Sequence, residues 1–486
     1  MMESDVGSRK SEVGNPHASR ARFARNLKSE IQNQKSESTR PISSPFAAIM
    51  PDAWTLQAKS ATSRVVERTL LVLAALFVAT GFGLLALWPV SRVSFGKGLA
   101  AFAIWAISFT LAHLVLNRRL PNRDPLLLPV SALLSGWGLI EVGRLAPPFL
   151  NRQIIWLPIS IVVLLAVAAA PRDLRWLKRY RYTWLLGGLL LLAATFVFGV
   201  NPSGASVERL WLRAGPVYLQ PSEILKLLFV AFLSSYLAEK RDLITTTGPR
   251  FGRFRLPALP YLAPLLMMWG LAMVLLASQQ DMGAAVLFFF TFLAMLYIAS
   301  GQWGYVIGGL GLFLVGASVA YRLFSRVALR VDIWWNPWAD ASGRAFQIVQ
   351  SLIALGEGGI LGQGLGQGAP TVIPVVHSDF VYAAIGEEFG LMGTLAVIAL
   401  FGILMLRGFR AATRARAPFA QLLGAGLATL IGLQAWVIMA GNARLIPLTG
   451  ITLPFLSYGG SSLLASCVAV GLLLQISNTR FQVSNE

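Results

Sequence analysis

The chain has 486 residues, of which 55% are hydrophobic and only 13% are charged, and its formal net charge is +19. Soluble domains carry roughly 25% charged residues, so this composition excludes an ordinary soluble protein and indicates an integral membrane protein. The single cysteine, Cys467, excludes a disulfide framework and a cysteine metal cluster.

The first segment, residues 1–60, is rich in Ser, Asn, Lys and Arg and has no sustained hydrophobic periodicity. We predict a disordered cytoplasmic tail. The segment lacks an apolar run followed by a small-residue cleavage site, so it is not expected to be a cleaved signal peptide.

Long apolar runs dominate the rest of the chain. A helix needs about 20 apolar residues to cross a bilayer, and these runs do not alternate as the strands of a membrane barrel would. We predict an all-α polytopic membrane bundle of about twelve transmembrane helices. The expected spans are residues 70–90, 97–116, 125–146, 153–170, 182–200, 222–238, 258–278, 282–300, 303–323, 380–406, 420–441 and 460–476.

Basic residues are concentrated in alternate connections between these spans. The connection at 172–181, for example, holds five of them. The positive-inside rule then places the basic connections and both termini in the cytoplasm. Because the positive charge is explained by topology, we expect no nucleic-acid partner.

The longest connection on the opposite side, residues 325–379, contains three tryptophans and a glycine-rich run. It has too many aromatic and aliphatic residues for disorder, so we predict a structured extracytoplasmic loop. Trp334, Trp335 and Trp338 are expected at the level of the lipid headgroups, either with a functional role or only as anchors.

Ionisable residues inside a membrane span are costly, so they are usually functional or paired. Glu223 and Lys226 are three residues apart and share one helix face. Two interpretations stand: a structural ion pair, or a polar pocket in which Lys226 binds an anion such as pyrophosphate. Asp281 directly precedes a span and is spaced to cap it.

Asp379 stands where the long loop ends and a span begins. It is either the N-cap of that helix or a carboxylate at the mouth of a cavity, able to accept a proton. Glu387 and Glu388 lie deeper in the same span, and we assign neither to chemistry.

Several motifs, in this order, resemble those of the SEDS family (shape, elongation, division and sporulation), the RodA and FtsW polymerases of cell-wall peptidoglycan. They are W-x-x-x-G at 211–215, Q-P-S-E with Lys226 at 220–226, Q-Q-D-x-G at 279–283, the glycine-rich block at 336–366, H-S-D-F at 377–380 with G-E-E at 386–388, and P-x-x-G…L-P-F-x-S-Y-G-G-S-S at 447–462. Val375 stands where the family usually has a Glu, and Gln280 where it usually has a Pro.

The resemblance implies a division of the chain into the tail, two additional N-terminal membrane helices at 61–120, as in some RodA-like members, and a polymerase core at 121–480. It also implies the reaction. The 4-hydroxyl of one lipid II sugar would attack the anomeric carbon of a lipid-linked glycan, with inversion and release of undecaprenyl pyrophosphate.

The resemblance further assigns residues and partners. Asp379 would be the general base. The substrate-binding residues would be Trp211, Arg213, Gln220, Glu223, Lys226, Asp281, Gln347, His377 and Ser457. The expected cofactor is a divalent cation, Mg²⁺ or Mn²⁺, with no organic cofactor, and the expected protein partner is a class B penicillin-binding protein. The location would be the bacterial cytoplasmic membrane.

Two other functions stay open on the residues alone. Twelve spans with buried charges also suit a lipid II flippase or transporter. A non-catalytic scaffold for cell-wall assembly is the other alternative. The distinctive motifs lie on one side of the membrane only, which favours an enzyme.

Overall fold

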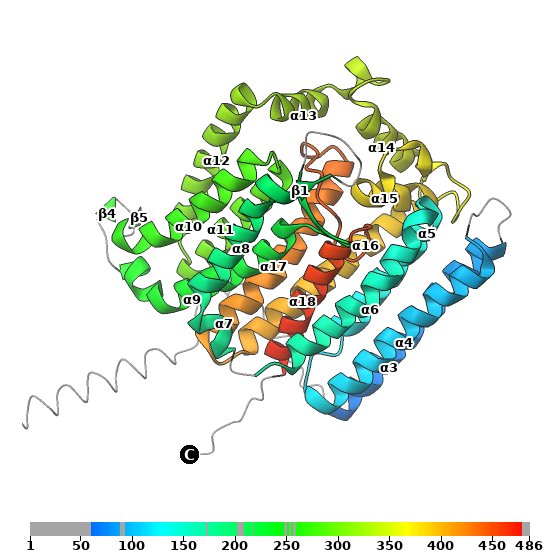
Figure 1. Cartoon of the computed structure of the whole chain (residues 1–486), viewed down its shortest axis with the longest axis horizontal. Coiled ribbons are helices and arrows are strands. Elements are labelled where there is room, and N and C mark those ends of the chain that lie inside the picture. The colour runs from blue at the N-terminus through cyan, green and yellow to red at the C-terminus, as the bar shows by residue number, and fades with distance from the viewer. Residues whose placement is uncertain are drawn as a thin grey trace, which may run out of the picture.

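The computed structural model describes residues 60–87, 93–171, 174–201, 209–215, 217–246, 250–251, 254–255 and 259–478 (Figure 1). The predicted tail, apart from Ser60, lies outside the described residues.

The predicted all-α membrane bundle is confirmed, with a helix at every expected span. These helices are α3 (Ser60–Leu87), α4 (Phe95–Arg119), α5 (Leu127–Leu145), α6 (Pro147–Ala169), α8 (Arg181–Phe198), α9 (Pro221–Thr246), α10 (Leu259–Ser278), α11 (Met282–Ser300), α12 (Trp303–Leu323), α16 (Val381–Arg414), α17 (Pro418–Asn442) and α18 (Gly460–Ser477). Ten of them are long and apolar enough by themselves to cross a membrane; α5 and α10 are the exceptions within the described chain.

Local sequence explains several helix ends. Pro221 and Pro418 are the first residues of α9 and α17, where a missing N–H costs no helical hydrogen bond. Asp281 caps α11 by accepting a hydrogen bond from the Ala284 N–H at 3.1 Å, as its position in the sequence predicted. Gly301, with φ 72°, terminates the same helix.

The bundle has a buried centre and a lipid-facing periphery. Helices α9, α11, α17 and α18 are largely buried by their neighbours, whereas α12 has no buried residue. In Figure 1, α3 and α4 pack along one side of the bundle beside α5 and α6, and α12 lies on the other side. The central helices are therefore the ones whose polar side chains are removed from lipid.

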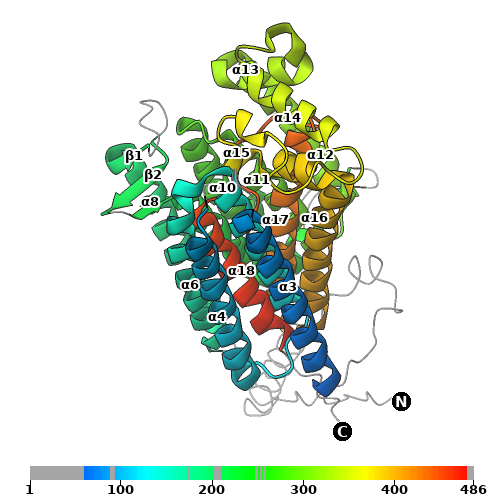
Figure 2. The same ribbon diagram turned by 90° about the vertical axis from the view of Figure 1, so that its right-hand side faces the viewer.

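The two ends of the bundle differ. At one end the basic connections gather around the end of α18, where the Asn122 N–H donates to Asn478 at 2.9 Å and Arg407 pairs with Asp124. Figure 2 shows the other end, which carries the long segment between α12 and α16. We call this the outer end. The grouping of the basic connections at one end agrees with the topology expected from their charge.

The outer end also holds a small antiparallel sheet. Its strands are β1 (Gly199–Val200), β2 (Trp211–Ala214) and β3 (Val217–Leu219), and Arg213 lies opposite Tyr218 in the register. Among the described residues outside the long segment, the remaining elements are a short helix, α7 (Arg175–Arg179), and a second hairpin, β4 (Arg250–Phe251) with β5 (Phe254–Arg255).

The long outer segment is folded, as its composition predicted. It forms α13 (Ser325–Trp335), the 3₁₀ turn η2 (Pro337–Asp340), α14 (Phe346–Glu357), the 3₁₀ turn η3 (Pro370–Val372) and α15 (Val376–Asp379). Trp335 and Trp338 are exposed, whereas the Trp334 indole donates to the Arg444 carbonyl at 3.0 Å. Trp334 therefore fastens α13 to the turn after α17.

The glycine-rich run lies directly against a break in α16. Gly390 has φ 64° and ψ −161°, which interrupts the helix. Main-chain hydrogen bonds cross the contact, from Leu391 N–H to Gly359 O and from Gln363 N–H to Glu387 O, each 2.9 Å. A Cβ on Gly390 would lie 2.5 Å from the Ile360 carbonyl oxygen. Glycine is required here both for its backbone angles and for the close approach.

We expect Gly390→Ala to lower the free energy of unfolding by about 2–5 kcal/mol, because it adds backbone strain and overpacking at one position. Thermal unfolding in detergent measures the change. Gly402→Ala is the matched control, since Gly402 lies in the same helix with no atom within 4 Å of an added Cβ. That control should be neutral or slightly stabilising. Equal unfolding of the two variants would contradict the prediction.

Candidate active site

Asp379 lies at the outer end, in a turn of its own. It is the last residue of α15, and the N-cap position of α16 belongs to Phe380, which has no capping side chain. The Ser378 hydroxyl donates to Asp379 Oδ1 at 2.7 Å. The interpretation of Asp379 as the cap of the following helix is therefore wrong, because the chain completes a separate turn before α16 begins.

That turn is held through its own main-chain carbonyls, which accept hydrogen bonds from its neighbours. Asn442 Nδ2, at the buried end of α17, donates to the Asp379 carbonyl at 2.8 Å, and the Tyr458 N–H donates to the His377 carbonyl at 2.8 Å. The Ser457 hydroxyl donates to the Ser378 carbonyl and accepts from the Leu453 N–H. The Asp379 backbone is thus fixed from two sides, and Ser457 acts by holding it.

His377 packs as an aromatic ring. Its imidazole lies 4.9 Å from the Phe149 ring and 5.7 Å from the Tyr458 ring, centroid to centroid. Burial lowers the pKa of His377 below its usual value, so the ring is neutral at neutral pH. His377 thus helps to pack the turn that carries Asp379.

A second polar cluster lies between the central helices. Lys226 Nζ is 2.5 Å from Glu223 Oε2 and 2.7 Å from Gln434 Oε1, and Gln434 Nε2 donates to the Thr452 carbonyl. The Lys226 side chain is only 5% exposed. The predicted ion pair is present, and it joins α9 to α17 and to the loop before α18.

Asp281 connects this cluster with α11. Besides capping that helix, its carboxylate accepts a hydrogen bond from Ser222 at 3.3 Å. Burial raises the pKa of the Asp281 carboxyl, and the hydrogen bonds from Ala284 and Ser222 oppose that rise.

The loop between α17 and α18 joins Asp281 to Asp379. A Cβ on Gly283 would lie 2.5 Å from the Thr449 carbonyl oxygen, so the start of α11 packs on this loop. The next residue, Gly450, has φ 70° and lies beside the Asp379 carboxylate. Arg330, from α13, donates to the Thr449 carbonyl at 3.0 Å. Arg330 was not among the predicted site residues, because nothing in the sequence separates it from the other arginines of this segment.

Other predicted site residues lie in the surrounding outer structure. Trp211 and Arg213 are in β2, and Arg213 donates to the Gly215 carbonyl and stacks over Tyr218. The Gln220 N–H binds the Ser461 hydroxyl, which ties the hairpin to α18.

Gln347, in α14, donates weakly to the Pro374 carbonyl at 3.5 Å, just before the turn that holds Asp379. Gln347 therefore borders this turn.

Glu387 and Glu388 hold the glycine-rich segment in place. Arg144 pairs with Glu388 at 3.0 Å and donates to the Gly368 carbonyl at 2.9 Å, while Glu387 accepts from the Ala369 N–H. These contacts provide structural partners for both acids, consistent with leaving them out of the chemistry.

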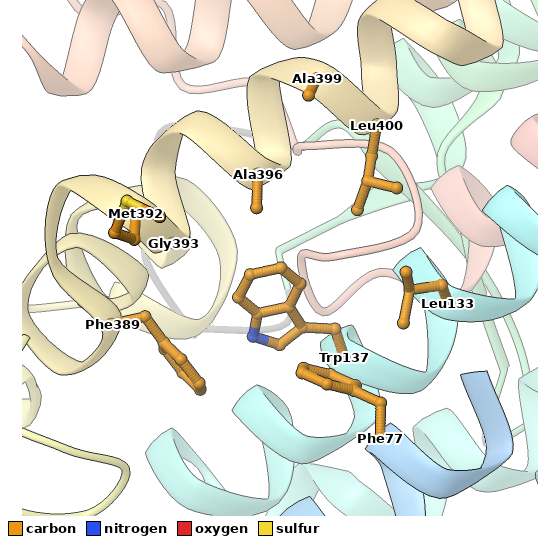
Figure 3. Close-up of a pocket in the computed structure, with 9 residues that line it drawn as sticks. All are labelled: Phe77, Leu133, Trp137, Phe389, Met392, Gly393, Ala396, Ala399 and Leu400. Carbon is orange, nitrogen blue, oxygen red and sulfur yellow. The ribbon is translucent and has the colours of Figure 1, made fainter. Parts of the chain in front are cut away.

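An apolar pocket of about 480 Å³ opens on the side of the bundle below this segment (Figure 3). Trp137 of α5 forms its floor between Phe77 of α3 and Phe389 of α16, at ring distances of 5.3 and 5.2 Å. The remaining lining residues are Leu133, Met392, Gly393, Ala396, Ala399 and Leu400. This hollow faces the lipid side of α16, the helix that follows Asp379.

The donor groups of the site do not form a metal cage. Within the described residues, no group of three or more His, Cys, Asp or Glu side chains could hold a metal ion. The expected Mg²⁺ or Mn²⁺ therefore stays a prediction, and we assign no step to it.

Residues 139–482 match the family model of the FtsW, RodA and SpoVE cell cycle proteins. The peptidoglycan glycosyltransferase RodA of Mycobacterium tuberculosis is 40% identical over 380 residues, covering 76% of this chain and 81% of that protein. The probable peptidoglycan glycosyltransferase FtsW of Geobacter metallireducens is 36% identical, covering 68% and 84%.

Two solved structures share the fold. One, of a peptidoglycan synthase complex that coordinates polymerization and crosslinking, is 28% identical with a TM-score of 0.60, covering 74% of this chain and 99% of that chain. The other, the rod shape determining protein RodA of Thermus thermophilus, is 26% identical with a TM-score of 0.54, covering 74% and 98%. The bundle, its outer polar site and these matches agree: the chain belongs to the FtsW, RodA and SpoVE family.

Proposed function

We propose that this multi-pass membrane protein is a peptidoglycan glycosyltransferase that polymerises lipid II. The observation that carries the proposal is the fixed Asp379 turn at the outer end, directly above a membrane bundle with an apolar, lipid-facing pocket. The related RodA and FtsW proteins carry the name of this activity. A substrate with a lipid tail and a sugar head needs an apolar groove for the tail and a polar site for the sugar in one protein.

In the proposed reaction, the Asp379 carboxylate takes the proton of the 4-hydroxyl of the acceptor sugar. The oxygen of that hydroxyl forms a bond to the anomeric carbon of the donor while the bond from that carbon to the diphosphate oxygen breaks. Undecaprenyl pyrophosphate leaves, and the configuration inverts. Pyrophosphate is a good leaving group, so one carboxylate base and a cation near the diphosphate suffice.

Several finer assignments belong to the same proposal. The apolar pocket between α3, α5 and α16 is suited to an isoprenoid chain. The protein partner would be a class B penicillin-binding protein, in line with the related complex that coordinates polymerization and crosslinking. The bundle would lie in the bacterial cytoplasmic membrane with both termini in the cytoplasm, so that its outer end meets lipid II.

The test is incubation of the purified chain with lipid II, with and without a class B partner, followed by gel analysis of the products. Glycan chains that lengthen with time, more strongly with the partner, are the expected result. Movement of lipid II across vesicle membranes without chain growth would indicate a transporter instead. No product, together with normal cell-wall assembly after replacement of Asp379, would indicate a scaffold.

A further inference from the structure

Helix α13 crosses the outer end of the protein, far from the C-terminal ends of α4 and α18 (Figures 1 and 2). None of its residues is fully buried, although Ile333 packs against the hydrophobic core. Hydrogen bonds of the Trp334 indole and of two arginines fasten it to the loop after α17. Arg444 donates to the carbonyls of Trp334 and Trp335, each at 2.8 Å, and Arg330 donates to Thr449.

Arg444 acts at the end of the helix. The last carbonyls of a helix lack partners within it and carry partial negative charge, so a guanidinium there stabilises the C-terminus. Arg444 itself lies in the turn after α17, with φ 55°. These contacts fix the C-terminal end of α13 on the loop. Arg330 lies in the same helix, a little more than one turn before that end.

The Arg330 guanidinium lies beside the proposed base. Its Nη2 is 3.3 Å from the point where a Cβ on Gly450 would lie, and Asp379 Oδ2 is 3.7 Å from the same point. Burial raises the pKa of the Asp281 carboxyl, and the charge of Arg330 is the smallest of the effects that oppose that rise. One cation of α13 thus acts on two acids, Asp379 in α15 of the same outer segment and Asp281 at the start of α11.

Lys226 is differently placed. Its ammonium already binds Glu223 and Gln434, and its side chain is almost fully buried. Of the five N–H donors of Arg330, the described contacts use one, from Nη1 to the Thr449 carbonyl. A guanidinium also presents paired donors that match two oxygens of a phosphate, which an ammonium does not.

We propose that Arg330 binds the diphosphate of the lipid-linked donor next to Asp379. This inference rests on the proposed function and names a residue for its leaving group. The positive charge meets the negative charge that accumulates on the diphosphate as the sugar–oxygen bond breaks. Because Arg330 is carried by α13, the diphosphate site is complete only when that helix is seated on the 443–450 loop.

The test measures equilibrium binding of undecaprenyl pyrophosphate and of undecaprenol to the purified protein in detergent. Arg330→Ala should weaken binding of the pyrophosphate by about ten- to a hundredfold, as expected for loss of a hydrogen bond between charged groups. Binding of undecaprenol, which has no phosphate, should stay unchanged. The affinity of Arg330→Lys for undecaprenyl pyrophosphate should lie between those of the wild type and Arg330→Ala, since lysine keeps the charge but loses the paired donors.

Arg344→Ala is the matched control, because Arg344 belongs to the same outer segment and its side chain is 72% exposed in a pair with Asp340. It should bind both ligands as the wild type does. If Arg330→Ala fails to fold, as judged by thermal unfolding, Arg330→Lys decides the question.

Wild-type affinity for undecaprenyl pyrophosphate in Arg330→Lys and Arg330→Ala, or an equal loss for undecaprenol, would overturn the inference. Either result leaves polymerisation by the wild type untouched. Absence of polymer from lipid II with the wild type would instead refute the proposed function.

Discussion

Asp379→Asn should reduce the rate of lipid II polymerisation by about 10²–10⁴-fold, the contribution of a general base, while the protein stays folded. The amide cannot take a proton from the acceptor hydroxyl. It has the same shape, and its oxygen can still accept the hydrogen bond that the Ser378 hydroxyl gives to the carboxylate. The Asn442 side-chain amide binds the main-chain carbonyl of residue 379, which the substitution does not change, so the turn should keep its position.

The measurement is the initial rate of polymer formation by purified protein with its partner, alongside thermal unfolding. Asp332→Asn is the matched control, because Asp332 is an exposed acid of the outer segment that binds the Tyr321 hydroxyl. It should polymerise at the wild-type rate. Full activity in Asp379→Asn would rule out this carboxylate as the base.

Lys226→Ala should lower the free energy of unfolding by about 3–5 kcal/mol, because it leaves the Glu223 carboxylate buried without its cation. We expect turnover to fall strongly as well, since the same network holds Gln434 against the Thr452 carbonyl. Denaturant unfolding in detergent and the polymerisation rate measure the two effects. Lys240→Ala, near the end of the same helix, is the control, and its more exposed side chain makes a near-neutral result the expectation.

A double variant separates the two interpretations of the pair. Lys226→Met with Glu223→Gln removes both charges, so stability should largely return if the pair is structural. Recovery of turnover along with stability would show that the pair only supports the bundle. Recovery of stability with turnover still lost would assign it a role in the reaction. Unchanged stability in Lys226→Ala alone would contradict the buried ion pair altogether.

The bundle itself was predictable because its determinants are local. Twenty apolar residues in a row require a helix in a bilayer, since the backbone has no other way to satisfy its hydrogen bonds. The spans, the cap at Asp281 and the Glu223–Lys226 pair follow from spacings of a few residues along one helix. The basic connections fall at one end because they are alternate connections between spans, and their charge predicts that this end is cytoplasmic.

The site required contacts between residues far apart in the chain. Gln434 is 208 positions from Lys226, and Arg144 is 244 from Glu388. The spacing that made Asp379 resemble a cap could not show that a separate turn precedes α16.

By itself the sequence determined that a helix forms at each expected span and which residues carry charge into the helices, while the ends of several helices, such as α3 and α6, lie up to ten residues from their predicted positions. Only the tertiary structure decided that Arg330 lies beside Asp379, because that neighbourhood depends on how α13 seats on a loop more than a hundred residues later in the chain. Helix formation is governed by nearest neighbours and the bilayer, whereas the meeting of two charges across a fold depends on all the packing between them.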